Sequence, residues 1–161
     1  MLLKVLRVFT LLLAALSLTM ESAHVLELPQ KLGYDPQMYA VVNGSLYKYF
    51  AIVGGVYQLG AIIAAFVLVL AVRGRKTVFA WTHGGALLLL TAFLVWLGVV
   101  APVNGQIADA VHLNPETVPA LWTTLYKRWE YGHAAGFALQ LCGYVALLIS
   151  LVVETPQQVR A

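Results

Sequence analysis

Two short motifs in this chain place a histidine and a glutamate together, in reversed order. His24 and Glu27 lie three residues apart near the end of one long apolar segment, and Glu130 and His133 lie three residues apart at the start of another. Residues with this spacing share one face of a helix. If the two segments run antiparallel, histidine lies opposite histidine and glutamate opposite glutamate. Because ionisable residues inside membrane spans are costly and usually functional, the four side chains predict a site.

These side chains suit more than one chemistry. Two imidazoles and two carboxylates can hold iron, copper, manganese or zinc, so His24, Glu27, Glu130 and His133 are the predicted metal ligands, with haem a weaker alternative. The Glu-x-x-His spacing occurs in di-iron bundles, but only Glu21 is placed to add a carboxylate, which favours a mononuclear site. The same four residues are the predicted catalytic acid and base. The alternative is a buried polar clamp between helices.

Three further residues near the same membrane side are predicted to bind a substrate. Asn104 could bind a carbonyl group or orient an imidazole, and its alternative role is that of a turn residue. Arg128 could bind an anionic or phenolate oxygen, although a long basic side chain also serves as an interface anchor. Trp129 could form the wall of a pocket for a flat apolar ligand, although aromatic residues also form the belt at membrane interfaces.

The composition identifies the solvent around these residues as a lipid bilayer. Hydrophobic residues make up 61% of the 161 residues and charged residues 11%, against roughly 25% charged in soluble domains. A membrane span needs about 20 apolar residues, and four segments meet that length: 8–28, 49–72, 78–100 and 129–153. We therefore predict an all-α integral membrane protein, one domain over 1–161, folded as an antiparallel four-helix bundle.

The segments between these spans carry turn and helix-breaking signals. Pro29 is expected to end the first span, and 30–45 is expected to be a loop with turns because it contains Gly33, Asp35-Pro36 and Asn43-Gly44. The third span is expected to end at Ala101-Pro102. The longest connection is then 104–125, with a turn at 114–117 and a short interfacial helix near 119–128.

The basic residues favour one orientation and argue against nucleic acid as a partner, because they sit at helix ends. Six lie on the side of the termini and the tight second connection, against four on the other side: Lys4, Arg7, Arg73, Arg75, Lys76 and Arg160, against Lys31, Lys48, Lys127 and Arg128. This excess predicts cytoplasmic termini, in a bacterial inner membrane. The basic start also resembles a signal peptide, but a cut after Ala23 would leave Glu21 where a small residue is expected, so a retained span is favoured.

Several of these segments resemble one family of small membrane proteins. The sequences HVLELPQK at 24–31, APVN at 101–104 and RWEYGH at 128–133, with the region of Leu46, Tyr47 and Phe50, are similar to bacterial members of the anthrone-oxygenase-like family. The resemblance covers most of the chain from the end of the first span. It implies a four-span fold and oxidation chemistry, since the best-known members oxidise polyketide anthrones to anthraquinones. Members often carry an arginine shortly after the final histidine, where this chain has 134–136 as Ala-Ala-Gly.

Two functions are therefore predicted. The first is a membrane oxidoreductase or oxygenase that acts on a small lipophilic, phenol- or quinone-like substrate, with proton abstraction by a buried carboxylate or imidazole followed by reaction with oxygen. The second is a non-enzymatic protein that handles a metal ion or protons, or a small subunit of a larger membrane complex; a homo-oligomer is a further possibility. Polar residues continuing through the membrane would favour the second function, and the spans offer only Gln58 and Gln140 near their middles.

Overall fold

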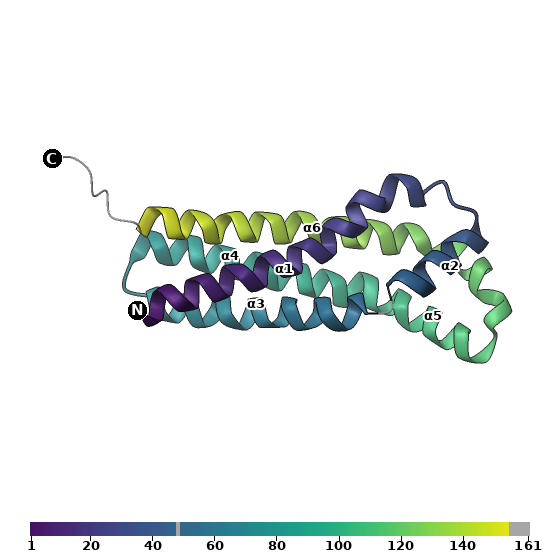
Figure 1. Cartoon of the computed structure of the whole chain (residues 1–161), viewed down its shortest axis with the longest axis horizontal. Helices are drawn as coiled ribbons and strands as arrows, with labels where there is room; N and C mark the ends of the chain where they lie inside the picture. The colour runs from purple at the N-terminus through teal and green to yellow at the C-terminus, as the bar shows by residue number, and fades with distance from the viewer. Residues whose placement is uncertain (48, 155–161) are drawn as a thin grey trace.

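The computed structural model describes residues 1–47 and 49–154, and all regular elements in this part of the chain are helices. Figure 1 shows their arrangement. In chain order they are α1 (Leu2–Lys31), α2 (Pro36–Leu46), α3 (Phe50–Val72), α4 (Lys76–Val95), a π-helix (Trp96–Val100), α5 (Ala101–Leu113), a 3-10 turn (Pro115–Thr117) and α6 (Val118–Glu154).

Four helical stretches are long and apolar enough to cross a membrane: α1, α3, the continuous stretch from α4 to α5, and α6. Helix α1 packs against α3 and α6, and α4 packs against the same two helices, which gives a four-helix bundle. The predicted all-α membrane fold is confirmed. The start of α1, the turn between α3 and α4 and the end of α6 lie at one end of the bundle, here called the terminal end, and α2 and α5 lie at the other, here called the site end (Figure 1).

Small residues allow the helices to approach closely in the middle of the bundle. Gly85 of α4 faces Gly143 of α6, and a Cβ atom added at Gly85 would lie 2.9 Å from the carbonyl oxygen of Gly143. Buried alanines such as Ala14 and Ala86 belong to the same core cluster. Such close packing is the usual source of helix association in lipid.

The structure corrects the prediction for the first connection. Helix α1 continues through Pro29 to Lys31, and 36–46 forms helix α2 instead of a loop. Pro29 removes only one backbone hydrogen bond near the end of α1, where the cost is small. Pro36 occupies the first turn of α2, where proline is tolerated, and the Asp35 carboxylate accepts a hydrogen bond from the Met38 amide, 2.8 Å away. The Asp-Pro pair is therefore a helix start rather than a turn.

The third span also continues beyond its predicted end. The chain remains helical through Pro102, by way of the π-helix, to Leu113. Pro102 has no amide hydrogen to donate to the Gly98 carbonyl, four residues earlier. The Arg128 guanidinium replaces that donor: its Nη2 donates to the Gly98 oxygen and its Nε to the Val99 oxygen, both at 3.1 Å.

The connection between the third and fourth spans is shorter than predicted. The turn expected at 114–117 is present as the 3-10 turn, but the helix expected at 119–128 is the beginning of α6 and runs on into the last span. Trp122 is consequently fixed to the same rigid helix as His133.

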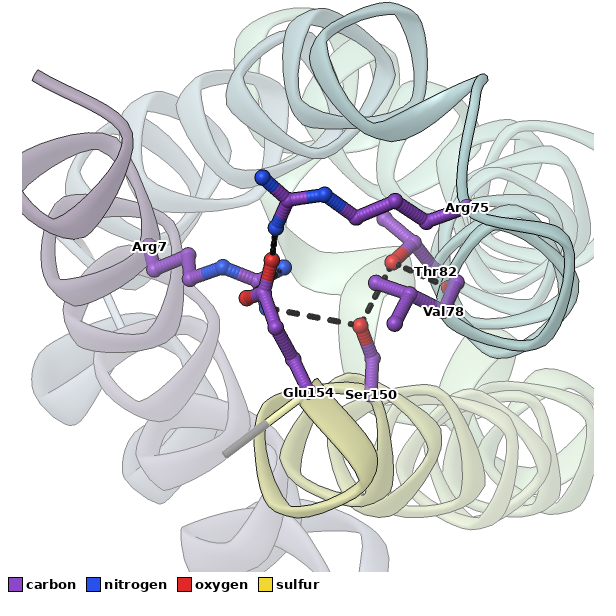
Figure 2. Close-up of polar contacts among 6 residues, drawn as sticks. All are labelled: Arg7, Arg75, Val78, Thr82, Ser150 and Glu154. Carbon is purple, nitrogen blue, oxygen red and sulfur yellow. Dashed lines mark hydrogen bonds and ion pairs between the residues drawn. The ribbon is translucent and has the colours of Figure 1, made fainter. Parts of the chain in front are cut away.

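An ion-pair network around the buried Arg7 joins the helices at the terminal end (Figure 2). Arg7 of α1 is only 4% exposed and pairs with Glu154 at the end of α6, which also pairs with Arg75 from the turn before α4. Ser150 accepts a hydrogen bond from Arg7 at 3.5 Å and shares one with Thr82 of α4 at 2.6 Å. These contacts neutralise the Arg7 charge and hold three segments together.

Candidate functional site

The two histidines of the predicted site lie against each other where α1 packs on α6. The ring centroids of His24 and His133 are 4.0 Å apart and their planes differ by 29°. Both side chains are buried. The predicted proximity of these histidines is confirmed, because antiparallel helices bring the end of α1 beside the start of the membrane-spanning part of α6.

Glu21 completes this group, one turn earlier on α1. Its Oε2 lies 2.9 Å from Nδ1 of His133, within hydrogen-bond distance. Gly136 of α6 lies against this carboxylate, and a Cβ atom there would be in ordinary van der Waals contact with the same oxygen, at 3.5 Å. A carboxylate in this position orients the imidazole.

Glu130 lies in a different environment, although it is on the same helix as His133. Its Oε1 accepts a hydrogen bond from the Tyr39 hydroxyl at 2.6 Å and lies 2.9 Å from the Lys31 ammonium. Glu130 and Lys31 are 1% and 2% exposed, so this is a fully buried ion pair. Burial, together with the hydrogen bond to Glu130, raises the pKa of Tyr39, so the Tyr39 hydroxyl remains a donor.

Lys31 separates the two glutamates of the predicted ligand set. Its Nζ also lies 4.0 Å from Glu27, so the mirrored motifs do bring both carboxylates to one region, with a cation between them. Among residues 1–47 and 49–154, no three His, Cys, Asp or Glu side chains gather closely enough to hold a metal ion. The predicted quartet therefore divides into a histidine pair and a lysine-bound glutamate pair, and it does not fit a single metal site.

Aromatic rings join these two groups. The Trp129 ring lies 4.5 Å from the Lys31 ammonium on one side and 4.9 Å and 4.4 Å from the rings of His24 and His133 on the other. Tyr47 makes a similar bridge, because its ring centroid is 4.6 Å from His24 and its hydroxyl accepts a hydrogen bond of 3.3 Å from Lys31. The site is thus two polar layers separated by aromatic side chains.

The histidine layer opens into a cavity of about 460 Å³. Glu21, His24 and His133 line it from α1 and α6, and aromatic residues form much of the remaining wall: Tyr47, Phe50, Phe93, Trp96, Trp122 and Trp129. Buried polar atoms of lining residues that have no hydrogen-bond partner include Nδ1 of His24 and Nε2 of Gln58. The cavity is therefore apolar, with a few polar groups free to bind a ligand, which is the usual character of a small-molecule site.

The three residues predicted to bind a substrate have different positions. Trp129 and Asn104 line the cavity, and the Asn104 amide oxygen accepts a hydrogen bond from the Trp129 indole at 2.9 Å. Arg128 is exposed, is not among the lining residues and donates to the π-helix carbonyls described above. In this structure Arg128 stabilises the bend of the third span.

The sequence prediction missed the part played by Lys31, Tyr39 and Tyr47. A signal for Lys31 was present, because Glu27 and Lys31 are four residues apart and fall on one helix face with His24. That interpretation requires α1 to continue past Pro29. Tyr39 could be assigned only once 36–46 was known to be a helix packed against α6.

Comparisons with known proteins found no relative: no protein-family model matches the chain, and neither does any curated protein or solved structure.

Proposed function

We propose that this protein is a membrane enzyme that oxidises a lipophilic, phenol- or quinol-like molecule held in the cavity. The observation that carries the proposal is the buried Glu21–His133 pair on the wall of a ligand-sized, aromatic cavity. Cavities of about 300–1,000 Å³ commonly take small organic ligands. The resemblance to anthrone oxygenases points to the same class of chemistry, and we propose membership of that family on the same grounds.

In the proposed reaction, His133 is the general base. If Nδ1 donates its hydrogen to Glu21, then Nε2 carries the lone pair and can take a proton from a hydroxyl or an activated C–H group of the substrate. The Glu21 carboxylate stabilises the imidazolium that forms. The deprotonated substrate is electron-rich and reacts with dioxygen, which is the proposed oxidant. A quinol passes two electrons and two protons to dioxygen and becomes the quinone, with hydrogen peroxide as the second product; an activated CH2 group adds dioxygen to form a hydroperoxide, which loses water to leave a carbonyl group. Stacked His24 and the side chain of Gln58 supply polar contacts for substrate oxygens.

The packing below the site favours an enzyme over the alternative of a proton path. Ser17 donates to the Gln140 side chain at 2.9 Å, which adds one more polar contact between α1 and α6. Towards the terminal end, Gly85 packs closely against Gly143 and Ala14 is buried. Thr10, the buried polar residue between Ala14 and Arg7 on α1, donates to the Leu6 carbonyl of its own helix at 2.7 Å, so this hydroxyl is engaged within α1. A pocket closed at one end suits ligand binding better than transport.

The orientation is part of the proposal. The start of α1 and the turn before α4 carry the dense basic residues, so we place the terminal end in the cytoplasm and the site end at the outer face of a bacterial inner membrane. Lys31 does not weaken this assignment, because its charge is neutralised by Glu130.

The proposal is tested by oxygen uptake with anthrone and menadiol as probes, using the purified protein in lipid nanodiscs. His133→Ala and Glu21→Gln should reduce the rate of uptake about 100- to 10,000-fold, the usual contribution of a general base. His83→Ala is the matched control, because His83 lies on α4, outside the cavity lining, and stacks on Phe79. Unchanged uptake in folded His133→Ala protein would overturn the assignment of the base.

Two further measurements locate the bound substrate and test for a metal. Gly55→Phe should abolish binding and turnover, because Gly55 lines the cavity and an added Cβ there meets open space; Gly84→Phe, equally open but outside the cavity lining, should not. Metal analysis tests the ligand prediction. A stoichiometric transition metal that is lost in His133→Ala protein would replace base catalysis with a metal mechanism.

A further inference from the structure

The mouth of the cavity lies between α3 and α5. Helix α3 packs on α1 and α4, whereas α5 packs on α6 and the π-helix, and among the described residues no extensive packing joins α3 to α5. Cavity-lining residues of both helices are also exposed at the surface: Ala51 of α3, and Ala108 and Val111 of α5. Gly44 of α2 is also an exposed lining residue, so the cavity opens at the site end of the bundle, where α2, α3 and α5 each contribute to its rim.

The α3 side of the mouth is apolar, whereas on the α5 side Asp109 and His112 are exposed beside Ala108 and Val111. Gly55, half-buried, also lines the cavity from α3, and none of the lining residues on α3 or α5 carries a charge. Ile52 and Val56, beside it on α3, are 66% and 65% exposed. Since α3 is a membrane-spanning helix that begins at Phe50, these residues lie inside the bilayer, near its site-end surface.

The buried part of the cavity wall carries polar side chains. His24 and Gln58 are 5% and 7% exposed, and each has a side-chain nitrogen without a partner, so the polar groups of a ligand belong there. The room of about 460 Å³ suits a ring system but not a long chain in addition. A molecule with a polar ring and a long apolar tail would satisfy both ends, with the ring on the buried nitrogens and the tail passing through the mouth into lipid.

We propose that the natural ligand is such a tailed molecule, an isoprenoid or alkyl quinone or phenol that enters from the bilayer between α3 and α5 and leaves its tail there. This inference rests on the proposed function, since it concerns the same cavity. The inference requires more than the proposed function does. A ring without a tail would satisfy the proposed function, whereas the inference requires a tail that lies in the mouth.

Binding of two probes with one ring tests the inference. Menadione has no tail, and menaquinone carries the same naphthoquinone with an isoprenoid tail. Quenching of the fluorescence of the cavity tryptophans is measured in nanodiscs, with each probe expressed as its concentration in the lipid. We expect menaquinone to bind at least tenfold more tightly than menadione. Ile52→Lys and Val56→Lys, exposed beside the mouth but outside the cavity lining, place a charge where the tail should pass, so they should remove that advantage and leave menadione binding unchanged. Ile63→Lys, 64% exposed on α3 and outside the cavity lining, should behave as the unmodified protein.

Each contrary outcome overturns the inference in a recognisable way. Equal affinity for the two probes would show that the tail makes no contact, and the proposed function would stand. A menaquinone advantage that survives both mouth substitutions would show that the tail leaves elsewhere. Loss of both probes in folded mouth variants would show that the ring itself lies in the mouth, which contradicts its placement on the buried nitrogens. Binding of neither probe by folded protein would overturn the proposed function as well.

Discussion

A single buried cation changes what the neighbouring carboxylates can do. Lys31 lies within 2.9 Å of Glu130 and 4.0 Å of Glu27, so both glutamates of the mirrored motifs face a positive charge instead of the histidines. Glu21, which is on the opposite side of His24 along α1, is left to hydrogen-bond His133. Residue type alone therefore does not determine which glutamate contacts the imidazoles. The position of Lys31 does, because it pairs with Glu27 and Glu130 and leaves Glu21 for His133.

The Lys31–Glu130 pair gives a prediction at this scale. Lys31→Met should lower the free energy of unfolding by about 3–5 kcal/mol, because it leaves a fully buried carboxylate without its counter-charge. The double variant Lys31→Met with Glu130→Leu should recover much of that loss, since no charge is then buried. Denaturation of the purified protein by a titration with sodium dodecyl sulfate measures both.

Lys76→Met provides the control for that experiment, because Lys76 is exposed at the start of α4 and its replacement should change stability by less than about 0.5 kcal/mol. If Lys31→Met were as stable as this control, the ion pair would contribute nothing to the fold.

At the scale of elements, helix continuity positions the site. Helix α1 continues through Pro29, which places Lys31 near Tyr39 of α2. Helix α6 begins as early as Val118, so Trp122, Trp129 and His133 are on one continuous helix. The bend of the third span at the π-helix carries α5 away from α3, and the cavity lies between them. The site thus depends on the length of the helices as well as on the contacts between them.

The contact between α4 and α6 gives the prediction at this scale. Gly85→Ala should destabilise the protein by about 1–3 kcal/mol, because the new methyl group would lie 2.9 Å from the backbone oxygen of Gly143 and 3.0 Å from Leu147. Gly84→Ala is the matched control. It adds the same methyl group one residue away, where nothing lies within 4 Å, and alanine should favour the helix by up to about 1 kcal/mol. Equal stabilities of the two variants would contradict the close helix approach.

At the scale of the whole molecule, the bundle has two polar ends with different partners. The terminal end is closed by the Arg7, Arg75 and Glu154 network, whereas the site end carries α2, α5 and the cavity (Figures 1 and 2). The two ends of the bundle therefore differ in structure. One end holds helices together through ion pairs, and the other carries the cavity.

The topology prediction belongs to this scale. In a chain whose single Cys142 has been replaced by alanine, Gln37→Cys and Glu116→Cys should react with a membrane-impermeant maleimide added outside intact cells. Gly74→Cys should react only after the cells are broken open. All three positions are exposed, so a difference in labelling reports the side of the membrane. Labelling of Gly74→Cys in intact cells would reverse the orientation proposed from the basic residues.

The sequence alone determined the class of fold and the meeting of the two histidines. Long apolar segments must become helices in lipid, because every backbone polar group has to be paired there, and antiparallel helices with reversed motifs bring His24 and His133 to one depth. The tertiary structure alone decided which carboxylate serves them. That choice depended on α1 continuing past Pro29, on α2 being a helix and on Lys31 turning inward to Glu130, all of which arise from packing between segments far apart in the chain. Local sequence signals indicate that a proline disfavours a helix or that a turn can begin. They do not indicate the tertiary contacts that stabilise a helix in spite of such a signal.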